Sequence, residues 1–153
     1  MREVTGDLIH MAKTGQFDVI IHGCNCFCTM GSGIAAQIKN EFPSVYEADK
    51  STKKGDRGKM GWYTYAGVNM SNGVTFTIIN AYTQYRYGHK ACHVDYDAVS
   101  AVFNRLSKLI PDHARIGYPM IGAGLGGGNW DLISSIIDRE FITKNHTLVR
   151  YDQ

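Results

Sequence analysis

A short apolar run at residues 18–22 constrains the fold of this chain more than any other feature. Asp18-Val19-Ile20-Ile21-His22 places three β-branched residues in a row, and Gly23 with a polar segment ends the run. Such a run is typical of a strand that is buried on both faces. It therefore predicts a central strand in a sheet that helices cover on both sides.

Strands and helices are predicted to alternate along the rest of the chain. The Asn72-Gly73 pair indicates a hairpin turn, and Pro111 is expected to end a long amphipathic helix. We predict an α/β fold, a three-layer α/β/α sandwich with a mixed, mostly parallel central sheet. After the first strands, the expected elements are helices at about 34–42, 43–54, 95–110 and 132–141, and strands at 60–66, 74–80, 116–120 and 147–151.

Composition limits the classes of function. At 153 residues with a hydrophobic share of 44%, the chain is expected to form one domain, residues 1–153, which excludes intrinsic disorder and a two-domain dehydrogenase or kinase. The net charge of +2 gives no basic surface for a nucleic-acid backbone. No apolar run approaches the ~18 residues of a membrane span, and the start lacks a secretion signal. We therefore expect a cytoplasmic protein with no membrane partner.

Two glycine loops carry the strongest chemical signal. The first glycine loop, residues 29–35, follows the strand that ends near His22. The second glycine loop, residues 122–128, follows the strand expected to end near Met120. Each joins the carboxyl end of a strand to the amino end of a helix, where unpaired backbone N–H groups attract an anion. Two such loops at one sheet edge predict a site for two linked phosphates, although glycines also serve simply as tight turns.

Two other phosphate-binding patterns fit less well. Gly122, Gly124 and Gly127 have the spacing G-x-G-x-x-G, which in dinucleotide-binding folds is followed about 20 residues later by an acidic residue. Only Asp152 stands near that position, and no second nucleotide-binding half follows it. Neither loop ends in Gly-Lys-Ser/Thr, so a P-loop is excluded. No cofactor is expected.

Histidine and cysteine alternate after the central strand. If His22, Cys24, Cys26 and Cys28 are extended, they span roughly 20 Å at about 3.3 Å per residue, which is too far to surround one zinc ion. We expect buried, reduced thiols and no metal site. His22 stands where open α/β sheets bind ligands. It is either a core histidine or, with an ordinary pKa of about 6.5, a base or nucleophile.

Four short segments, taken together and in order, carry a family resemblance over nearly the whole chain. They are Gly6-Asp7-Leu8, His22–Asn25 through Gly31–Ala35, Asn80–Gln84, and Pro119–Leu125 through Trp130. Jointly they resemble the macro domain family, whose members bind ADP-ribose. The H-x-C-N-C pattern is most similar to the branch that removes phosphate from ADP-ribose 1″-phosphate, a by-product of tRNA splicing. Small proteins of this kind also occur in bacteriophages.

The resemblance implies a role for each matching residue. Asp7 would accept the adenine amino group and the Leu8 N–H would read a ring nitrogen, while helix capping is the other interpretation of Asp7. Asn25 would hold the distal ribose, unless its side chain only forms a turn. The first loop would bind phosphate through Gly31, Ser32, Gly33 and Ile34, and the second through Gly122, Gly124, Leu125 and Gly126.

The resemblance also implies an enzyme. His22 matches the histidine proposed as catalytic in the phosphatase branch, and with Asn25 beside it would either deprotonate the attacking water or attack phosphorus directly. The loops would stabilise the transferred phosphoryl group without a metal. The binding partner of the protein would be a small nucleotide, ADP-ribose or its 1″-phosphate.

Two further functions stay open. Family members that cleave ADP-ribose from protein side chains or nucleic-acid bases carry an acidic residue in the second loop or a nucleophilic lysine earlier in the chain. Here Gly126 stands at the acidic position, and Lys53 and Lys54 lie in the region of the lysine. The second hypothesis is therefore an ADP-ribosyl hydrolase acting on protein or DNA. The third is a non-catalytic ADP-ribose reader.

Three further predictions concern aromatic and polar residues. Tyr82, Thr83 and Gln84 are expected to line the cleft floor near the distal ribose. The stretch from Tyr85 to His93 is either a lid or a surface loop. Trp130 is expected to pack beneath the second loop.

Overall fold

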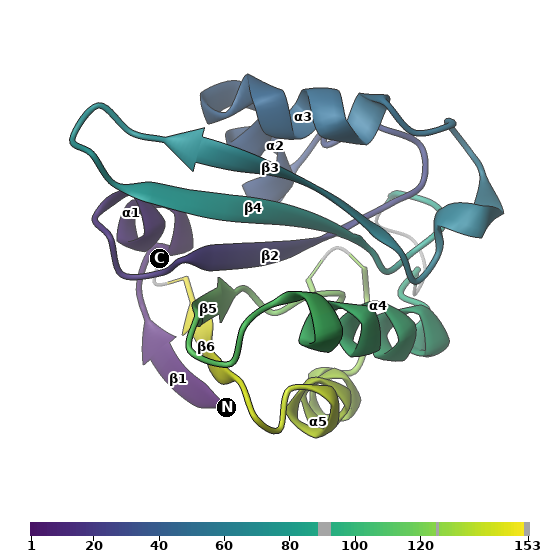
Figure 1. The fold of residues 1–153 in the computed structure, drawn as a ribbon. Coiled ribbons are helices and arrows are strands. Elements are labelled where there is room, and N and C mark those ends of the chain that lie inside the picture. Colours follow the sequence, from purple (N-terminus) through teal and green to yellow (C-terminus); the bar gives the residue numbers. More distant parts are fainter. Residues whose placement is uncertain (89–92, 125, 152–153) are drawn as a thin grey trace.

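The computed structural model describes residues 1–88, 93–124 and 126–151. Its strands and helices alternate as expected (Figure 1). The strands are β1 (Arg2–Thr5), β2 (Val19–Cys24), β3 (Tyr63–Asn69), β4 (Thr75–Tyr82), β5 (Arg115–Tyr118) and β6 (Asn145–Arg150). The helices are α1 (Leu8–Lys13), α2 (Gly33–Glu41), α3 (Pro43–Lys50), α4 (Tyr96–Leu109) and α5 (Trp130–Glu140), with a 3-10 turn, η1 (Arg57–Lys59).

The strands form one mixed sheet in the order β1-β6-β5-β2-β4-β3. The β3–β4 pair is antiparallel, and the other four pairs are parallel. Because the parallel strands run the same way, their carboxyl ends meet at one edge of the sheet, where open α/β proteins bind ligands. The predicted α/β sandwich with a mostly parallel sheet is confirmed.

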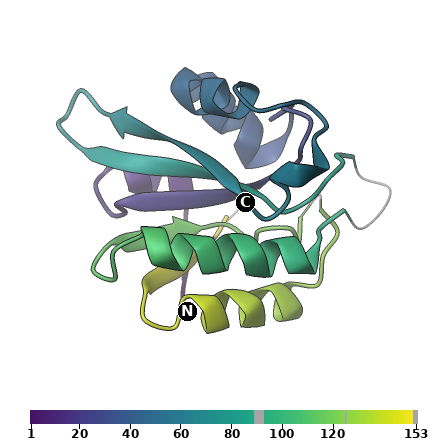
Figure 2. The same cartoon turned by 45° about the vertical axis from the view of Figure 1, so that its right-hand side comes forward.

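Helices cover both faces of the sheet. Helices α4 and α5 lie side by side on one face, and α1, α2 and α3 lie on the other (Figures 1 and 2). On β2, Ile21 belongs to the core beneath α4 and α5, whereas Ile20 belongs to the core beneath α1, α2 and α3. Successive strand residues point to opposite faces, so the apolar run at 18–22 fills both cores at once.

Several boundaries differ from the sequence-based prediction. The helix expected to reach Lys54 ends at Lys50, because the hydroxyls of Ser51 and Thr52 donate to the carbonyls of Ala48 and Asp49 and turn the chain. The six-residue helix α1 was foreseen only through the capping interpretation of Asp7. Its carboxylate cap, Asp7, accepts from the backbone N–H of His10.

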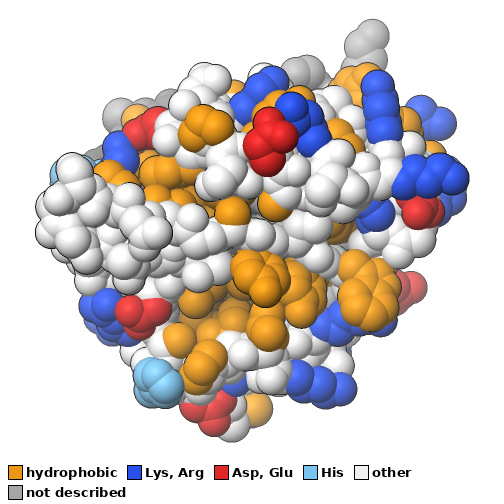
Figure 3. Space-filling model, turned by 45° about the horizontal axis from the view of Figure 1, so that its top comes forward, with side chains coloured by type: hydrophobic (Ala, Val, Ile, Leu, Met, Phe, Trp, Pro, Cys, Tyr) orange, Lys and Arg blue, Asp and Glu red, His pale blue; other side chains and the backbone are white. Residues whose placement is uncertain are grey.

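The surface carries both charged and hydrophobic regions. Figure 3 shows hydrophobic side chains gathered near the centre of one face, and the exposed large hydrophobic residues include Trp62 and Tyr65. The Arg105 guanidinium lies 3.9 Å from the centre of the Trp62 ring and covers part of the Trp62 side chain. Among the described residues, no helix has the length and apolar character needed to cross a bilayer.

Candidate functional site

Two adjoining cavities open at the edge where the parallel strands end. The larger measures about 810 Å³ and the smaller about 350 Å³. They share Gly23, Ser32, Ala35 and Gln84 in their walls. A ligand with two chemically different ends can therefore extend from one cavity into the other.

The larger cavity has an apolar wall with one carboxylate at its end. Leu8, Ile9 and Val149 contribute apolar surface, and Asp7 lies beside them. One oxygen of Asp7 accepts the His10 N–H at 3.1 Å as the cap of α1, and the same side chain lines the cavity. The carboxylate can therefore cap the helix with one oxygen and accept from a ligand amine with the other.

The first glycine loop borders both cavities. Gly31 lines the smaller cavity, Ser32 lines both, and Gly33 and Ile34 line the larger. Ser32 is the N-cap of α2 but makes no side-chain cap hydrogen bond, so the first-turn N–H groups of that helix stay available to an anion. Gly33 has a φ of +58°, a left-handed conformation that favours glycine.

The second glycine loop faces the first across the larger cavity, which Gly122, Gly124 and Gly126 all line. Close packing requires two of these glycines. A Cβ on Gly122 would lie 2.6 Å from a Val94 methyl, and one on Gly126 would lie 2.7 Å from the Gly122 carbonyl oxygen. Gly124 instead has open space within 4 Å of its Cβ position, so its backbone is exposed to whatever occupies the cavity.

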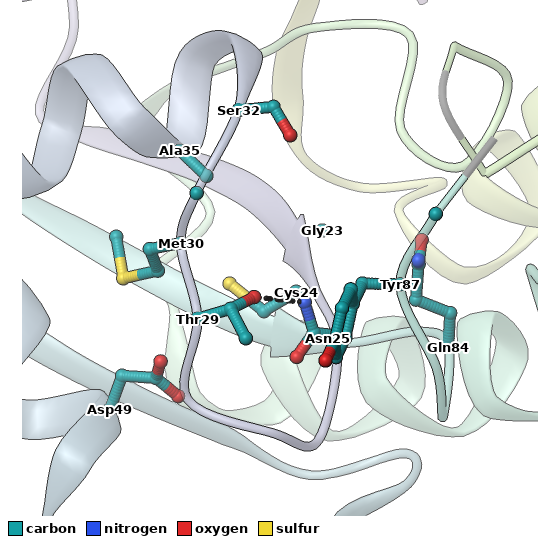
Figure 4. A pocket seen from close by; sticks show the side chains of 12 residues that line it. Gly23, Cys24, Asn25, Thr29, Met30, Ser32, Ala35, Asp49, Gln84 and Tyr87 are labelled. Atoms are coloured by element: carbon teal, nitrogen blue, oxygen red, sulfur yellow. Dashed lines mark hydrogen bonds between the residues drawn. The ribbon is translucent and has the colours of Figure 1, made fainter.

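Several polar side chains line the smaller cavity (Figure 4). Asn25 donates through Nδ2 to Thr29 Oγ1 at 2.8 Å and accepts the Phe27 N–H at 2.8 Å, so it forms the predicted turn and also lines the cavity. Tyr87 borders the same cavity and packs edge-on against Phe27, with ring centres 5.9 Å apart. The turn thus fixes Asn25 where a hydroxylated ligand can reach it.

The smaller cavity also holds a carboxyl group. Asp49 lines it from α3, although its exposed fraction is only 1%. Its Oδ1 accepts the Tyr82 hydroxyl at 2.7 Å. Desolvation raises the pKa of Asp49, while the Tyr82 hydrogen bond and the Lys59 charge act in the lowering direction.

His22 lies in the core instead of on a cavity wall. It is 1% exposed and lines neither cavity. Its Nε2 lies 2.6 Å from Asn80 Oδ1, and burial lowers its pKa to about 4, so the ring is neutral near neutral pH. The predicted attack on water or phosphorus requires the imidazole at the surface of the cavity, and the structure places it below that surface.

Of the three residues expected on the cleft floor, one lines the cavities and two are buried. Gln84 lines both cavities. Tyr82 was expected to contact ligand, yet it is 1% exposed, because its ring packs in the core with Cys24 and Cys26 and its hydroxyl turns to Asp49. Thr83 is also buried, and its hydroxyl has no hydrogen-bond partner within the described chain.

Other expected residues are placed as follows. Cys24 and Cys26 are buried free thiols, as predicted, and Cys28 is partly buried. Lys53 and Lys54 are exposed and line neither cavity. Leu125 lies outside the described residues, as does part of the Tyr85–His93 stretch. Trp130 packs against the core beneath α4 and α5.

Among the side chains that line the site, sequence reasoning gave no role to Asp49 on α3 or to the 70%-exposed Tyr151 after β6, which borders the larger cavity. Tyr87, after β4, lines the smaller cavity and belongs to the Tyr85–His93 stretch that was expected to be a lid or a surface loop. Tyr151 could have been suspected from its place directly after the last strand, because ligands gather at strand ends. Asp49 had no such signal, since it lies within a polar helix.

Comparison with known proteins identifies the family. The family model described as "Macro domain" matches residues 21–137. The chain belongs to the macro domain family. That match spans β2 through most of α5 and so includes both glycine loops.

Individual macro domain relatives agree with this assignment. The chain is 38% identical over 144 residues to an uncharacterised 17.5 kDa protein from the tk-vs intergenic region of Enterobacteria phage T4, covering 90% of this chain and 88% of that one. A protein of unknown function from Bacteroides thetaiotaomicron superimposes with a TM-score of 0.75 at 27% identity, over 99% and 97% of the two chains. Thermosipho africanus DarTG, solved with ADP-ribose, gives 0.74 at 16% identity, over 97% of this chain and 40% of that one.

Proposed function

We propose that this macro domain binds ADP-ribose across the two cavities and hydrolyses ADP-ribose 1″-phosphate to ADP-ribose and phosphate. One observation carries the proposal. A larger, mostly apolar cavity and a smaller cavity with several polar side chains share a wall of Gly23, Ser32, Ala35 and Gln84, and the second glycine loop lines the larger cavity. ADP-ribose has the matching order of parts: a flat base, two phosphates, and a second ribose.

The larger cavity suits the adenosine end. The Asp7 carboxylate accepts the exocyclic amine of adenine and the Leu8 backbone N–H donates to a ring nitrogen. Leu8, Ile9 and Tyr151 give the ring an apolar surface. The fold-level likeness to the Thermosipho chain that was solved with ADP-ribose is consistent with this ligand.

The part of the larger cavity that both glycine loops line suits the diphosphate. The first turn of α2 offers backbone N–H groups from one side, and the second glycine loop approaches from the other. Arg150 also lines the larger cavity, where it is paired with Glu3. Backbone amides therefore provide most of the anion binding, with one guanidinium nearby.

The smaller cavity suits the distal ribose and its 1″ substituent. Asn25 binds the ribose hydroxyls, and Thr29, Gly31 and Ser32 offer further polar groups to a phosphate. His22 acts from below as a positioning residue, because its ring supports Asn80 and does not face the cavity.

The residues that line the two cavities fit hydrolysis of a phosphate ester better than a lysine-dependent cleavage of ADP-ribose from protein or DNA. Within the described residues, no lysine lines either cavity, and Gly126 gives the second loop no carboxylate. The smaller cavity instead contains polar groups and Asp49.

The test is phosphorus NMR of the purified protein with ADP-ribose 1″-phosphate, with and without EDTA. The proposal predicts that the ester signal disappears, that free phosphate appears, and that EDTA does not prevent this. If the ester stays unchanged after prolonged incubation while the protein still binds ADP-ribose, the protein is a non-catalytic ADP-ribose reader and not a phosphatase. Release of ADP-ribose from modified DNA or protein, with no phosphate release, would favour the ADP-ribosyl hydrolase.

A further inference from the structure

A buried chain of hydrogen bonds joins His22 to the smaller cavity. His22 Nε2 lies 2.6 Å from Asn80 Oδ1, and Asn80 Nδ2 lies 3.1 Å from Thr64 Oγ1. Thr64 Oγ1 is 2.9 Å from the Tyr82 hydroxyl, which is 2.7 Å from Asp49 Oδ1. Asp49 is the member of this chain that lines the cavity.

The direction of the chain follows from its fixed donors and acceptors. Asn80 Nδ2 also points at the Val45 carbonyl at 3.1 Å, which can only accept, so the amide nitrogen is on that side and Oδ1 faces His22. His22 therefore donates from Nε2. Thr64 accepts from Asn80 and donates to Tyr82, and Tyr82 donates to Asp49.

Every donor in this chain points toward Asp49. A carboxyl group that accepts the last hydrogen bond of such a chain is stabilised in its ionised form. Among the described residues, the hydrogen bond to Asp49 side-chain oxygens comes from Tyr82 to Oδ1, so Oδ2 keeps its capacity to accept. Figure 4 shows the carboxylate extending from α3 toward the side of the loop that carries Thr29 and Met30.

One positively charged side chain and several neutral thiols surround Asp49. The Lys59 ammonium is the nearby cation, held by Thr52 Oγ1 at 2.8 Å and close to Cys28 Sγ at 3.6 Å. Burial raises the pKa of the Cys24 and Cys26 thiols and the charge of Asp49 raises it further, so both thiols stay protonated near neutral pH. In this surrounding, Asp49 is the carboxyl group able to exchange a proton with the cavity.

The structure assigns Asp49 as the general base of this site, the group that takes a proton from the water that attacks the 1″-phosphate. This inference rests on the proposed phosphatase function and adds its missing base. A water O–H bond breaks and its proton moves to Asp49 Oδ2 while the water oxygen bonds to phosphorus. The bond between phosphorus and the 1″ oxygen breaks, a solvent water gives that oxygen a proton, Asp49 releases its proton to solvent, and ADP-ribose and phosphate leave.

The assignment also gives His22 a place in the reaction. His22 is the first donor in the chain that ends at Asp49, so it acts through Asn80, Thr64 and Tyr82 and not by contact with substrate. Its neutral ring keeps one tautomer, with the proton on Nε2. The chain orients the base in the way that supporting residues orient other catalytic groups.

The test compares Asp49→Asn with Glu47→Gln, a control that removes an exposed carboxylate from the same helix. Calorimetry with ADP-ribose measures binding, thermal unfolding checks the fold, and phosphorus NMR measures hydrolysis. Asp49→Asn should bind ADP-ribose like the wild type and hydrolyse the ester at a rate lower by about 10² or more. Glu47→Gln should match the wild type in all three measurements.

Tyr82→Phe provides a second test that keeps the carboxylate. Losing the hydroxyl removes a hydrogen bond that lowers the pKa of Asp49, so the acid limb of the rate profile should move to higher pH. A profile unchanged by this variant contradicts the assignment.

The possible results separate this inference from the proposed function. If the wild type hydrolyses the ester and folded Asp49→Asn keeps its rate and pH profile, the assignment of Asp49 is overturned and the phosphatase stands. If the wild type binds ADP-ribose without hydrolysis, the phosphatase fails and the assignment fails with it. A slow Asp49→Asn with normal binding supports both.

Discussion

His22 on β2 and Asn80 on β4 stand opposite each other in the parallel sheet, joined by a 2.6 Å contact between Nε2 and Oδ1. This pairing holds the imidazole in the core and leaves the cavity wall to Asn25, Ser32 and Asp49. The histidine is therefore a structural support whose charge state matters for stability.

The first prediction concerns this charge state. The pKa of His22 is about 4 in the folded chain against 6.5 as its ordinary value, so the unfolded chain binds the extra proton first. The contribution of neutral His22 to the free energy of unfolding is fully present above pH 6.5 and is lost as the pH drops toward 4. The loss is about 3 kcal/mol at most, since one pKa unit corresponds to about 1.4 kcal/mol.

Urea unfolding at a series of pH values checks this. His22→Gln should remove the part of the acid loss that His22 causes, leaving the parts due to His146, whose pKa burial also lowers, and to carboxylates of lowered pKa such as Asp18 and Glu41. Equal acid sensitivity of the wild type and His22→Gln would show that the histidine is not held neutral.

The second prediction uses the open space beside Gly124. Valine there meets no atom within 4 Å of its Cβ and should fold normally, but its methyl groups enter the larger cavity. We expect ADP-ribose affinity to fall by about tenfold or more, which is about 1.4 kcal/mol. Gly67→Val is the control, because Gly67 on β3 also has open space and lies outside both cavities. Calorimetry that finds the same affinity for both variants would exclude the second loop from the site.

The third prediction separates the two roles of Asp7. Asparagine caps helices as well as aspartate, so Asp7→Asn should preserve the stability of α1. Loss of the carboxylate should weaken ADP-ribose binding by about 1 to 2 kcal/mol, because a charged acceptor is replaced by a neutral one. Asp131→Asn, an exposed first-turn carboxylate on α5, serves as the control in the same titration. Unaltered affinity in Asp7→Asn would mean that Asp7 is only a cap.

The fourth prediction tests the alternative chemistry. Lys54 is exposed and borders neither cavity, so Lys54→Ala should leave both ligand binding and hydrolysis unchanged. Rates are compared on ADP-ribose 1″-phosphate and on ADP-ribosylated DNA. A selective loss of activity on the DNA substrate would restore the lysine-dependent hydrolase.

The parts of this molecule that were predictable from sequence depend on local pattern. The run at Ile20 and Ile21 predicts a strand buried on both faces because alternate residues must enter different cores. Glycine at 33 and 122 marks the loops because few other residues adopt a positive φ.

The remaining features depend on contacts between distant segments. Asp49 belongs to a polar helix by pattern, and only the packing of α3 against β4 brings it to Tyr82 and the cavity. The burial of His22 likewise depends on Asn80, which lies 58 residues away in the chain. Side-chain partners at such separations leave no periodic signal in a single sequence.

The most direct measurement of the central claim is a calorimetric titration of the wild-type chain with ADP-ribose, set beside AMP and ribose 5-phosphate. Occupation of both cavities by one molecule predicts saturable binding of one ADP-ribose per chain, tighter than either fragment. Absence of heat with ADP-ribose, or an affinity no better than that of AMP, would contradict the account.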